Sequence, residues 1–124
     1  MARNILVADD DRTIAHLIKE IIERRGSTAL VAYDGEQAFQ IFNNFKVDLI
    51  ITDLKMPHVD GMSLIKMIRE LNTDIPIIII TGYGSDRNYS LAQSYGVTDF
   101  LSKPCSVVEI SRAIDSALSQ SKNA

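Results

Sequence analysis

Polar residues stand directly after four short apolar stretches of the sequence, where the ends of buried strands are expected. They are Asp9 and Asp10, Asp53, Thr81, and Lys103. Three carboxylates brought close together repel one another and favour a hard divalent cation with oxygen ligands, and Mg²⁺ suits a site with few carboxylates. A hydroxyl and an ammonium beside the metal supply what a phosphoryl group needs for binding. The central carboxylate, Asp53, would attack the phosphorus and form an acyl phosphate.

The stretch that leads into Asp53 has the pattern of a buried parallel strand. Residues 49–52 show no alternation of polar and apolar side chains, as expected when helices cover both faces of a sheet. Pro57 and Gly61 prevent the strand from continuing, so Asp53 is predicted at its carboxyl end. Because an ionised carboxylate is rarely buried without a partner, we expect a cation beside Asp53.

Other segments supply the elements that must position these residues. The expected strands cover residues 4–8, 28–32, 49–52, 76–80 and 96–101. Apolar residues at helical spacing indicate helices around residues 14–22, 38–45, 64–71 and 110–117, with a weaker helix at about 85–95. Helix starts are indicated by Asp34 with Gln37 and by Ser106 with Glu109, and a helix end by Gly26.

The order of strands and helices predicts an α/β fold. A strand followed by a helix occurs five times, and right-handed crossovers then give a doubly wound, five-stranded parallel sheet. If the first strand is flanked by the second and third, the strand order is 2-1-3-4-5, with the switch point between strands one and three. The carboxyl ends of all five strands lie on one edge of such a sheet, which would bring the polar residues to a single crevice.

Size and composition favour one globular domain. The 124 residues predict a single domain over 1–124 with its core at about 3–119. A net charge of −3 argues against nucleic acid as a direct partner, and the apolar run 75–80 is too short to span a membrane. The first three residues lead into a strand, which does not resemble an export signal. Cys105 is the one cysteine and cannot form an internal disulfide, which favours the cytoplasm.

The motifs at the strand ends resemble those of response-regulator receiver domains of two-component signalling, the CheY-like superfamily with a flavodoxin-like (βα)5 fold. They are Ile-Leu-Val-Ala-Asp9-Asp10, Asp53-Leu-Lys-Met-Pro57 with Asp60-Gly61, Ile-Ile-Thr81-Gly82, and Phe100-Leu-Ser-Lys103-Pro104. The likeness covers essentially the whole chain. Because the motifs occur in the right order, each at the end of the right strand, they are together far more specific than any one alone.

The resemblance implies a role for each residue of the site. Asp53 would accept a phosphoryl group from the phosphohistidine of a histidine kinase or phosphotransfer protein. Mg²⁺, or Mn²⁺ in its place, would be bound by Asp10, Asp53 and the backbone carbonyl of Lys55, with Asp9 acting through water. Thr81 and Lys103 would hold phosphoryl oxygens. The peptide bond between Lys103 and Pro104 corresponds to one that is cis in the family.

The resemblance also implies a signalling switch, not a turnover enzyme, which phosphorylates and dephosphorylates itself. Thr81 would turn toward the phosphoryl group, and Phe100 would fill the space beneath it, which reshapes the surface of helix four, strand five and helix five. Phe100 has no hydroxyl, so this change would act through packing alone. The surface would control an effector protein or a fused output domain, or a homodimer that forms on phosphorylation.

Two other functions fit parts of the pattern. Residues 9–13 match the Asp-x-Asp-x-Thr signature of haloacid-dehalogenase-type phosphatases, in which Asp9 would be the nucleophile and Asp11 the acid/base. The chain shows no cap for a substrate, however, and Asp11 is also the best candidate to cap the first helix. A flavodoxin-like FMN binder would need a phosphate loop after the first strand, where three acids would repel phosphate.

Overall fold

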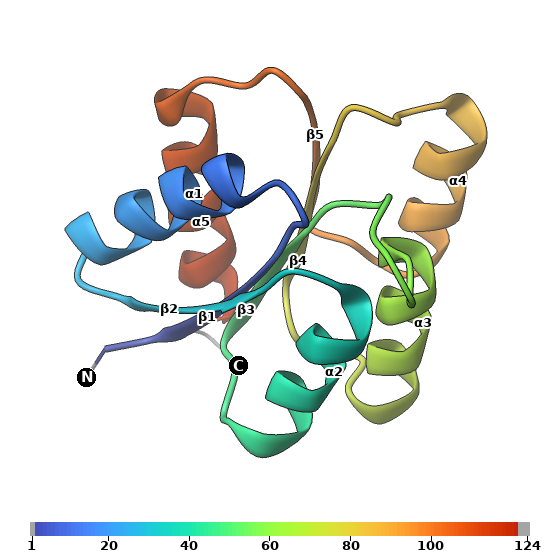
Figure 1. Ribbon diagram of the computed structural model, residues 1–124, viewed down its shortest axis with the longest axis horizontal. Coiled ribbons are helices and arrows are strands. Elements are labelled where there is room, and N and C mark those ends of the chain that lie inside the picture. The colour runs from blue at the N-terminus through green and yellow to red at the C-terminus, as the bar shows by residue number, and fades with distance from the viewer. Residues whose placement is uncertain (1, 122–124) are drawn as a thin grey trace.

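In the computed structural model, residues 2–121 are described; residues 1 and 122–124 of the domain predicted over 1–124 lie outside this part. Strands and helices alternate along the chain (Figure 1). They are β1 (Asn4–Ala8), α1 (Arg12–Arg24), β2 (Thr28–Ala32), α2 (Gly35–Asn44), β3 (Leu49–Thr52), α3 (Gly61–Leu71), β4 (Ile77–Thr81), α4 (Asp86–Ser94), β5 (Asp99–Ser102) and α5 (Val107–Ser121). The strands form one parallel sheet in the order β2-β1-β3-β4-β5, which confirms the predicted fold.

Helices cover both faces of the sheet and divide the core in two. Helices α1 and α5 lie on one face, and α2, α3 and α4 lie on the other (Figure 1). The side chains of β1, β3 and β4 are almost entirely buried, because these three inner strands have a helix layer on each side. Burying one such Ile or Leu side chain contributes roughly 1.5–3 kcal/mol to folding. The three strands therefore form a rigid base for the residues that follow them.

Some expected boundaries and buried positions were wrong. The last strand begins at Asp99 instead of residue 96, because Gly96 has a φ of 68° and closes the end of α4. Strand β4 covers Ile77–Thr81, one residue later than expected. Phe45 and Leu71, counted in the apolar stripes of their helices, are 54% and 62% exposed. Both stand where their helices end, beyond the surface that the sheet covers.

Strand register aligns the residues that were predicted to do chemistry. Ala8 of β1 is paired with Thr52 of β3, so the residues that follow each of them, Asp9 and Asp53, are neighbours across the strands. The Asp53 amide donates to the Ala8 carbonyl at 2.9 Å, which extends the pairing by one residue. Lys103 follows β5 in the same way, and its amide donates to the carbonyl of Thr81 at 2.9 Å. All of these residues lie at one edge of the sheet.

Candidate functional site

Asp53 is buried at the end of β3, with both carboxylate oxygens in hydrogen bonds. Its side chain is 5% exposed. Oδ1 accepts from the backbone amides of Leu54, at 2.6 Å, and Lys55, at 3.4 Å. Oδ2 accepts from the Lys103 ammonium at 2.6 Å. The cation expected beside the buried carboxylate is therefore supplied by Lys103.

The same ammonium also binds Asp9. Lys103 Nζ lies 2.9 Å from Asp9 Oδ2, and the other oxygen of Asp9 accepts from the Asp11 amide at 2.9 Å. Burial raises the pKa of Asp9, although the Asp11 amide and Lys103 oppose the rise. For Lys103, burial lowers the pKa, but the hydrogen bonds to Asp53 and Asp9 and the charges of these two residues together outweigh it, and the pKa is raised. Lys103 thus stays protonated at neutral pH and holds the two carboxylates together.

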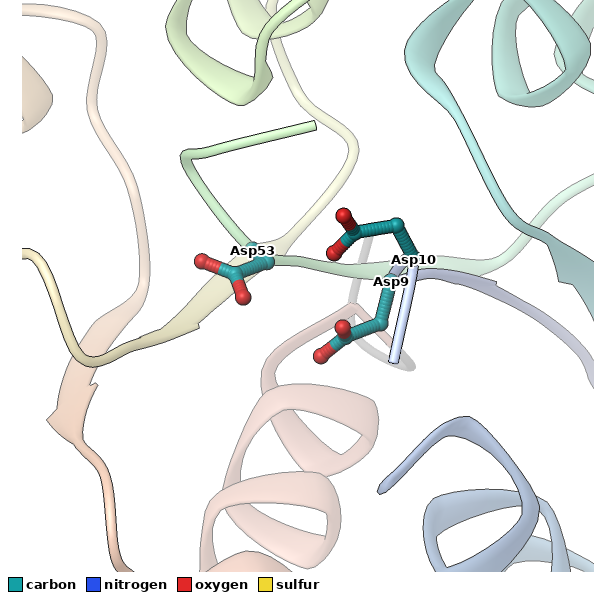
Figure 2. Close-up of side chains that lie close together, drawn as sticks. All are labelled: Asp9, Asp10 and Asp53. Carbon is teal, nitrogen blue, oxygen red and sulfur yellow. The ribbon is translucent and has the colours of Figure 1, made fainter. Parts of the chain in front are cut away.

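The carboxylates of Asp9, Asp10 and Asp53 form a compact group of oxygen ligands. Each offers an oxygen within 4.8 Å of the others. Figure 2 shows Asp9 and Asp10 extending from the end of β1 beside Asp53 at the end of β3. Asp10 is exposed while the other two are buried, so the group opens to solvent on one side. Several carboxylate oxygens with access to water match the preference of Mg²⁺ for hard ligands and retained waters.

A hollow of about 480 Å³ lies in front of Asp53 and leaves room for a small anion. Its lining comes from four separate loops and the first turn of α1: Asp10, Asp11, Ile14, Asp53, Lys55, Gly82, Tyr83 and Lys103. At its rim the Lys55 ammonium lies 4.8 Å from the centre of the Tyr83 ring. The arrangement puts the carboxylates of three aspartates and the ammonium groups of Lys55 and Lys103 around the same space. The Lys55 carbonyl, expected as a metal ligand, stays a prediction.

Thr81 and Phe100 do not line the hollow, and they are arranged differently from the state expected after phosphorylation. Thr81 is fully buried, and its hydroxyl oxygen accepts from the Tyr83 amide at 3.1 Å. The half-buried Phe100 ring packs edge-on against Tyr89 of α4, with 5.7 Å between ring centres. It also closely approaches Gly84, where an added Cβ would lie 3.4 Å from the ring. Phe100 is therefore packed against α4 and the segment before it.

Gly61 is a residue of the site whose role was not apparent from the sequence. It was expected to serve a turn or a helix entry, and it is indeed the first residue of α3, capped by Asp60. A Cβ on Gly61, however, would lie 1.9 Å from the carbonyl oxygen of Asp53 and 2.7 Å from Cα of Leu54. Gly61 thus permits the start of α3 to press against the backbone of Asp53. Only the glycine itself could have signalled this in the sequence.

Asp11 and the bond before Pro104 behave as the sequence indicated. The carboxylate of Asp11 accepts from the amides of Thr13 and Ile14 and caps α1. The peptide bond between Lys103 and Pro104 is cis. An Asp11 that caps a helix is occupied, which weighs against its use as the acid/base of a phosphatase.

Among residues 2–121, no helix is both long and apolar enough to cross a membrane.

Comparison with known proteins agrees with this geometry. Residues 5–115 match the response regulator receiver domain family. Response regulator GtcR of Aneurinibacillus migulanus is 37% identical over 118 residues, which cover 95% of this chain and 48% of that protein. Transcriptional regulatory protein CpxR of Escherichia coli (strain K12) is 35% identical over 117 residues, which cover 94% of this chain and 50% of that protein. The chain thus spans about half the length of these two relatives.

Solved structures show the same likeness over nearly the whole chain. A response regulator receiver domain protein from Clostridium thermocellum has a TM-score of 0.89 and 34% identity, covering 98% of both chains. The receiver domain of the Francisella response regulator 1452 has a TM-score of 0.87 and 36% identity, covering 95% of this chain and 98% of that one. These matches do not support the phosphatase alternative with Asp9 as nucleophile.

Proposed function

The chain belongs to the response regulator receiver domain family, and we propose that Asp53 is the residue through which it receives a phosphoryl group. The observation that carries this proposal is the position of Asp53 in the hollow: Lys103 binds one of its oxygens, and Asp9 and Asp10 each offer a carboxylate oxygen within 4.8 Å of it. Asp9 is less suitable, because it does not line the hollow, whereas Asp53 does. Asp10 lines the hollow but has no ammonium partner among the described residues.

Transfer to Asp53 needs one bond to form and one to break. A carboxylate oxygen attacks the phosphorus of a phosphohistidine, the bond from phosphorus to the imidazole nitrogen breaks, and the electron pair leaves with the imidazole. Mg²⁺, when bound by Asp10, Asp53 and the Lys55 carbonyl with Asp9 acting through water, offsets the negative charge that gathers on the phosphoryl oxygens. Asp53 is preorganised for attack, since the Leu54 amide fixes its rotamer.

Lys103 and Thr81 bind the transferred group in this proposal. Lys103 already lies 2.6 Å from Asp53 and can donate to phosphoryl oxygens with a small movement, while Asp9 keeps the ammonium in place. Thr81 must rotate its hydroxyl away from the Tyr83 amide to reach the same oxygens. Phosphorylation adds about −1.5 to −2 charges and strong acceptor oxygens, which favours that rotation.

Rotation of Thr81 would then release Phe100 from α4. The space vacated beneath Thr81 can accept the Phe100 ring, which would leave its contact with Tyr89. The surface formed by α4, β5 and α5 changes as a result. A complete shift between the two conformations of this surface, from a ratio of 1:99 to one of 99:1, requires that phosphorylation stabilise the second over the first by about 5.5 kcal/mol.

Partners and location follow from the proposed reaction and stay predictions. The phosphoryl donor would be a histidine kinase or a phosphotransfer protein. The altered surface would contact an effector or a fused output domain, or mediate a homodimer, and no direct contact with nucleic acid is expected. We further propose that the chain acts in the cytoplasm as a switch, without turnover of an external substrate. Mn²⁺ should replace Mg²⁺, because it shares the preference for oxygen ligands.

Incubation with acetyl phosphate tests the proposed chemistry without a kinase. With Mg²⁺, intact-protein mass spectrometry should show one added phosphoryl group, and chelation of the metal should abolish it. The Asp53→Asn variant should stay unlabelled. The matched control is Asp99→Asn, a half-buried carboxyl at the opposite end of β5, which should label like the unchanged protein. Full labelling of Asp53→Asn would contradict the proposal.

A further inference from the structure

Arg69, in the last turn of α3, donates hydrogen bonds to the backbone carbonyls of two neighbouring segments. Its Nε lies 2.7 Å from the carbonyl oxygen of Tyr95, and Nη2 lies 3.2 Å from that of Gly96, both at the end of α4. Nη1 contacts the carbonyls of Asn72, at 3.2 Å, and Ile75, at 2.8 Å, in the segment between α3 and β4. One guanidinium thus joins the C-terminal end of α4 to the body of the domain.

The chemistry of a helix end makes this contact strong. The carbonyls of Tyr95 and Gly96 come directly after the last residue of α4, at the end of the helix that carries partial negative charge, so a nearby cation is stabilising there. Hydrogen bonds from a charged donor are also stronger than those between neutral groups. Burial lowers the pKa of Arg69, but a guanidinium keeps its charge at neutral pH. The C-terminal end of α4 is therefore firmly attached.

The rest of α4 is weakly attached. Within α4, all of which the structure describes, Ala92 is the only fully buried residue. Near its N-terminal end, Asn88 Nδ2 donates to the Tyr83 carbonyl at 2.8 Å, and the exposed Tyr89 ring touches Phe100. Tyr83 in turn donates its amide to the Thr81 hydroxyl. The two residues expected to move on phosphorylation therefore act on the N-terminal end of the helix.

We propose that Arg69 is a positioning residue that makes the C-terminal end of α4 a pivot. Displacement of Thr81 and Phe100 then swings the N-terminal half of α4, including Tyr89, while the Arg69 end stays in place. The displacement rests on the proposed function, but the anchor at Arg69 does not. A pivot at one end amplifies a small change at Thr81 into a larger movement at the exposed end of the helix.

Amide hydrogen exchange measured residue by residue by NMR tests the anchor in the unphosphorylated chain. Arg69→Met should lower the protection of the Tyr95 and Val97 amides, which close the end of α4, by about tenfold. Arg69→Lys keeps the positive charge but lacks the planar guanidinium that binds several carbonyls at once, so the same amides should lose part of their protection. If Arg69→Met does not fold, Arg69→Lys is used in its place. Arg112→Met, at an exposed arginine of α5, is the control. Unchanged protection in both Arg69 variants would overturn the anchor.

Addition of Mg²⁺ and beryllium fluoride, an analogue of the phosphoryl group, tests the pivot. In the unchanged chain, exchange should change at Asn88 and Tyr89 and stay constant at Tyr95, whereas in Arg69→Lys the change should extend to Tyr95. Equal changes at both ends of α4 in the unchanged chain would overturn the pivot. If the analogue does not change the hydrogen exchange even of the Leu54 amide beside Asp53, the proposed function is refuted, and the pivot with it. The anchor at Arg69 would still stand, because it is measured in the unphosphorylated chain.

Discussion

The Lys103 ammonium lies 2.6 Å from a carboxylate oxygen of Asp53, although 50 residues separate the two in the sequence. Because the same ammonium also binds Asp9, it reduces the repulsion between two buried carboxylates. The ion pair between Lys103 and Asp53 explains how a carboxyl side chain can be buried at this position. It also places a positive charge where a phosphoryl group bound to Asp53 would need one.

Removal of the Lys103 ammonium should destabilise the fold. Lys103→Met leaves Asp9 and Asp53 buried without their cation. We expect a loss of roughly 2–3 kcal/mol in the free energy of unfolding, less than for a fully buried pair, because the ammonium borders an open hollow. Urea unfolding at neutral pH measures it. The control is Lys66→Met, at an exposed lysine of α3. Mg²⁺ should restore part of the loss, and equal stability of the two variants would show that the pair is unimportant.

Gly61 should tolerate no side chain. In Gly61→Ala the added Cβ meets the backbone of Asp53 and Leu54, which cannot move aside as a flexible side chain can, so we expect a loss of about 3 kcal/mol. Gly82→Ala is the matched control, since its Cβ would meet no heavy atom closer than the Lys103 Cβ at 4.0 Å. Thermal unfolding of both variants measures the difference. A Gly61→Ala protein as stable as Gly82→Ala would refute the close approach.

Thr81 should be required for the conformational response more than for phosphorylation. Thr81→Val keeps the shape of the side chain but removes the hydroxyl, so Asp53 should still accept a phosphoryl group. The NMR shifts of Tyr89 and Phe100 induced by beryllium fluoride and Mg²⁺ should then largely disappear. Thr98→Val, at a half-buried threonine before β5, should leave them in place. A full response in Thr81→Val would remove Thr81 from the switch.

The Cys105 thiol should react slowly. Burial, and then the charge of Glu109, raise the pKa of Cys105 in the folded chain above its ordinary value. Less thiolate is present at a given pH than in the unfolded chain, so alkylation by iodoacetamide should reach half its maximal rate at a higher pH than in urea. The stability contributed by the neutral thiol is fully present below the ordinary pKa and is lost as pH rises from that value through the raised pKa of the folded chain. In Cys105→Ser the free energy of unfolding should fall less with rising pH. If alkylation of the folded chain reached half its maximal rate at a lower pH than in urea, the raised pKa of Cys105 would be contradicted.

The fold and the placement of the polar residues could be predicted because both follow from strand ends. An apolar run without alternation, as in residues 49–52, fixes a buried parallel strand, and the residue after it must lie at the carboxyl edge of the sheet. Lys103 could be placed beside Asp53 by the same argument. The strand order also needed the assumption that the first strand is flanked by the second and third, and the sheet has that order.

Details that depend on contacts between distant segments could not be predicted. The sequence gives no sign that Lys103 binds Asp9 as well as Asp53, because this depends on side-chain directions at the edge of the sheet. Gly61 has an ordinary backbone conformation, so its importance comes from a neighbour across the loop. Arg69 looked like any polar residue at a helix end. Phe45 was expected on the apolar face of the second helix, but α2 ends one residue before it.

The identity of the phosphorylated aspartate tests the central claim most directly. After incubation with acetyl phosphate and Mg²⁺, the acyl phosphate can be reduced with borohydride, which marks its carrier permanently, and the digested peptides can be sequenced by mass spectrometry. The geometry of Lys103 and the hollow predicts the mark at Asp53 alone. A mark at Asp9 or Asp10, with Asp53 unmodified, would contradict the account.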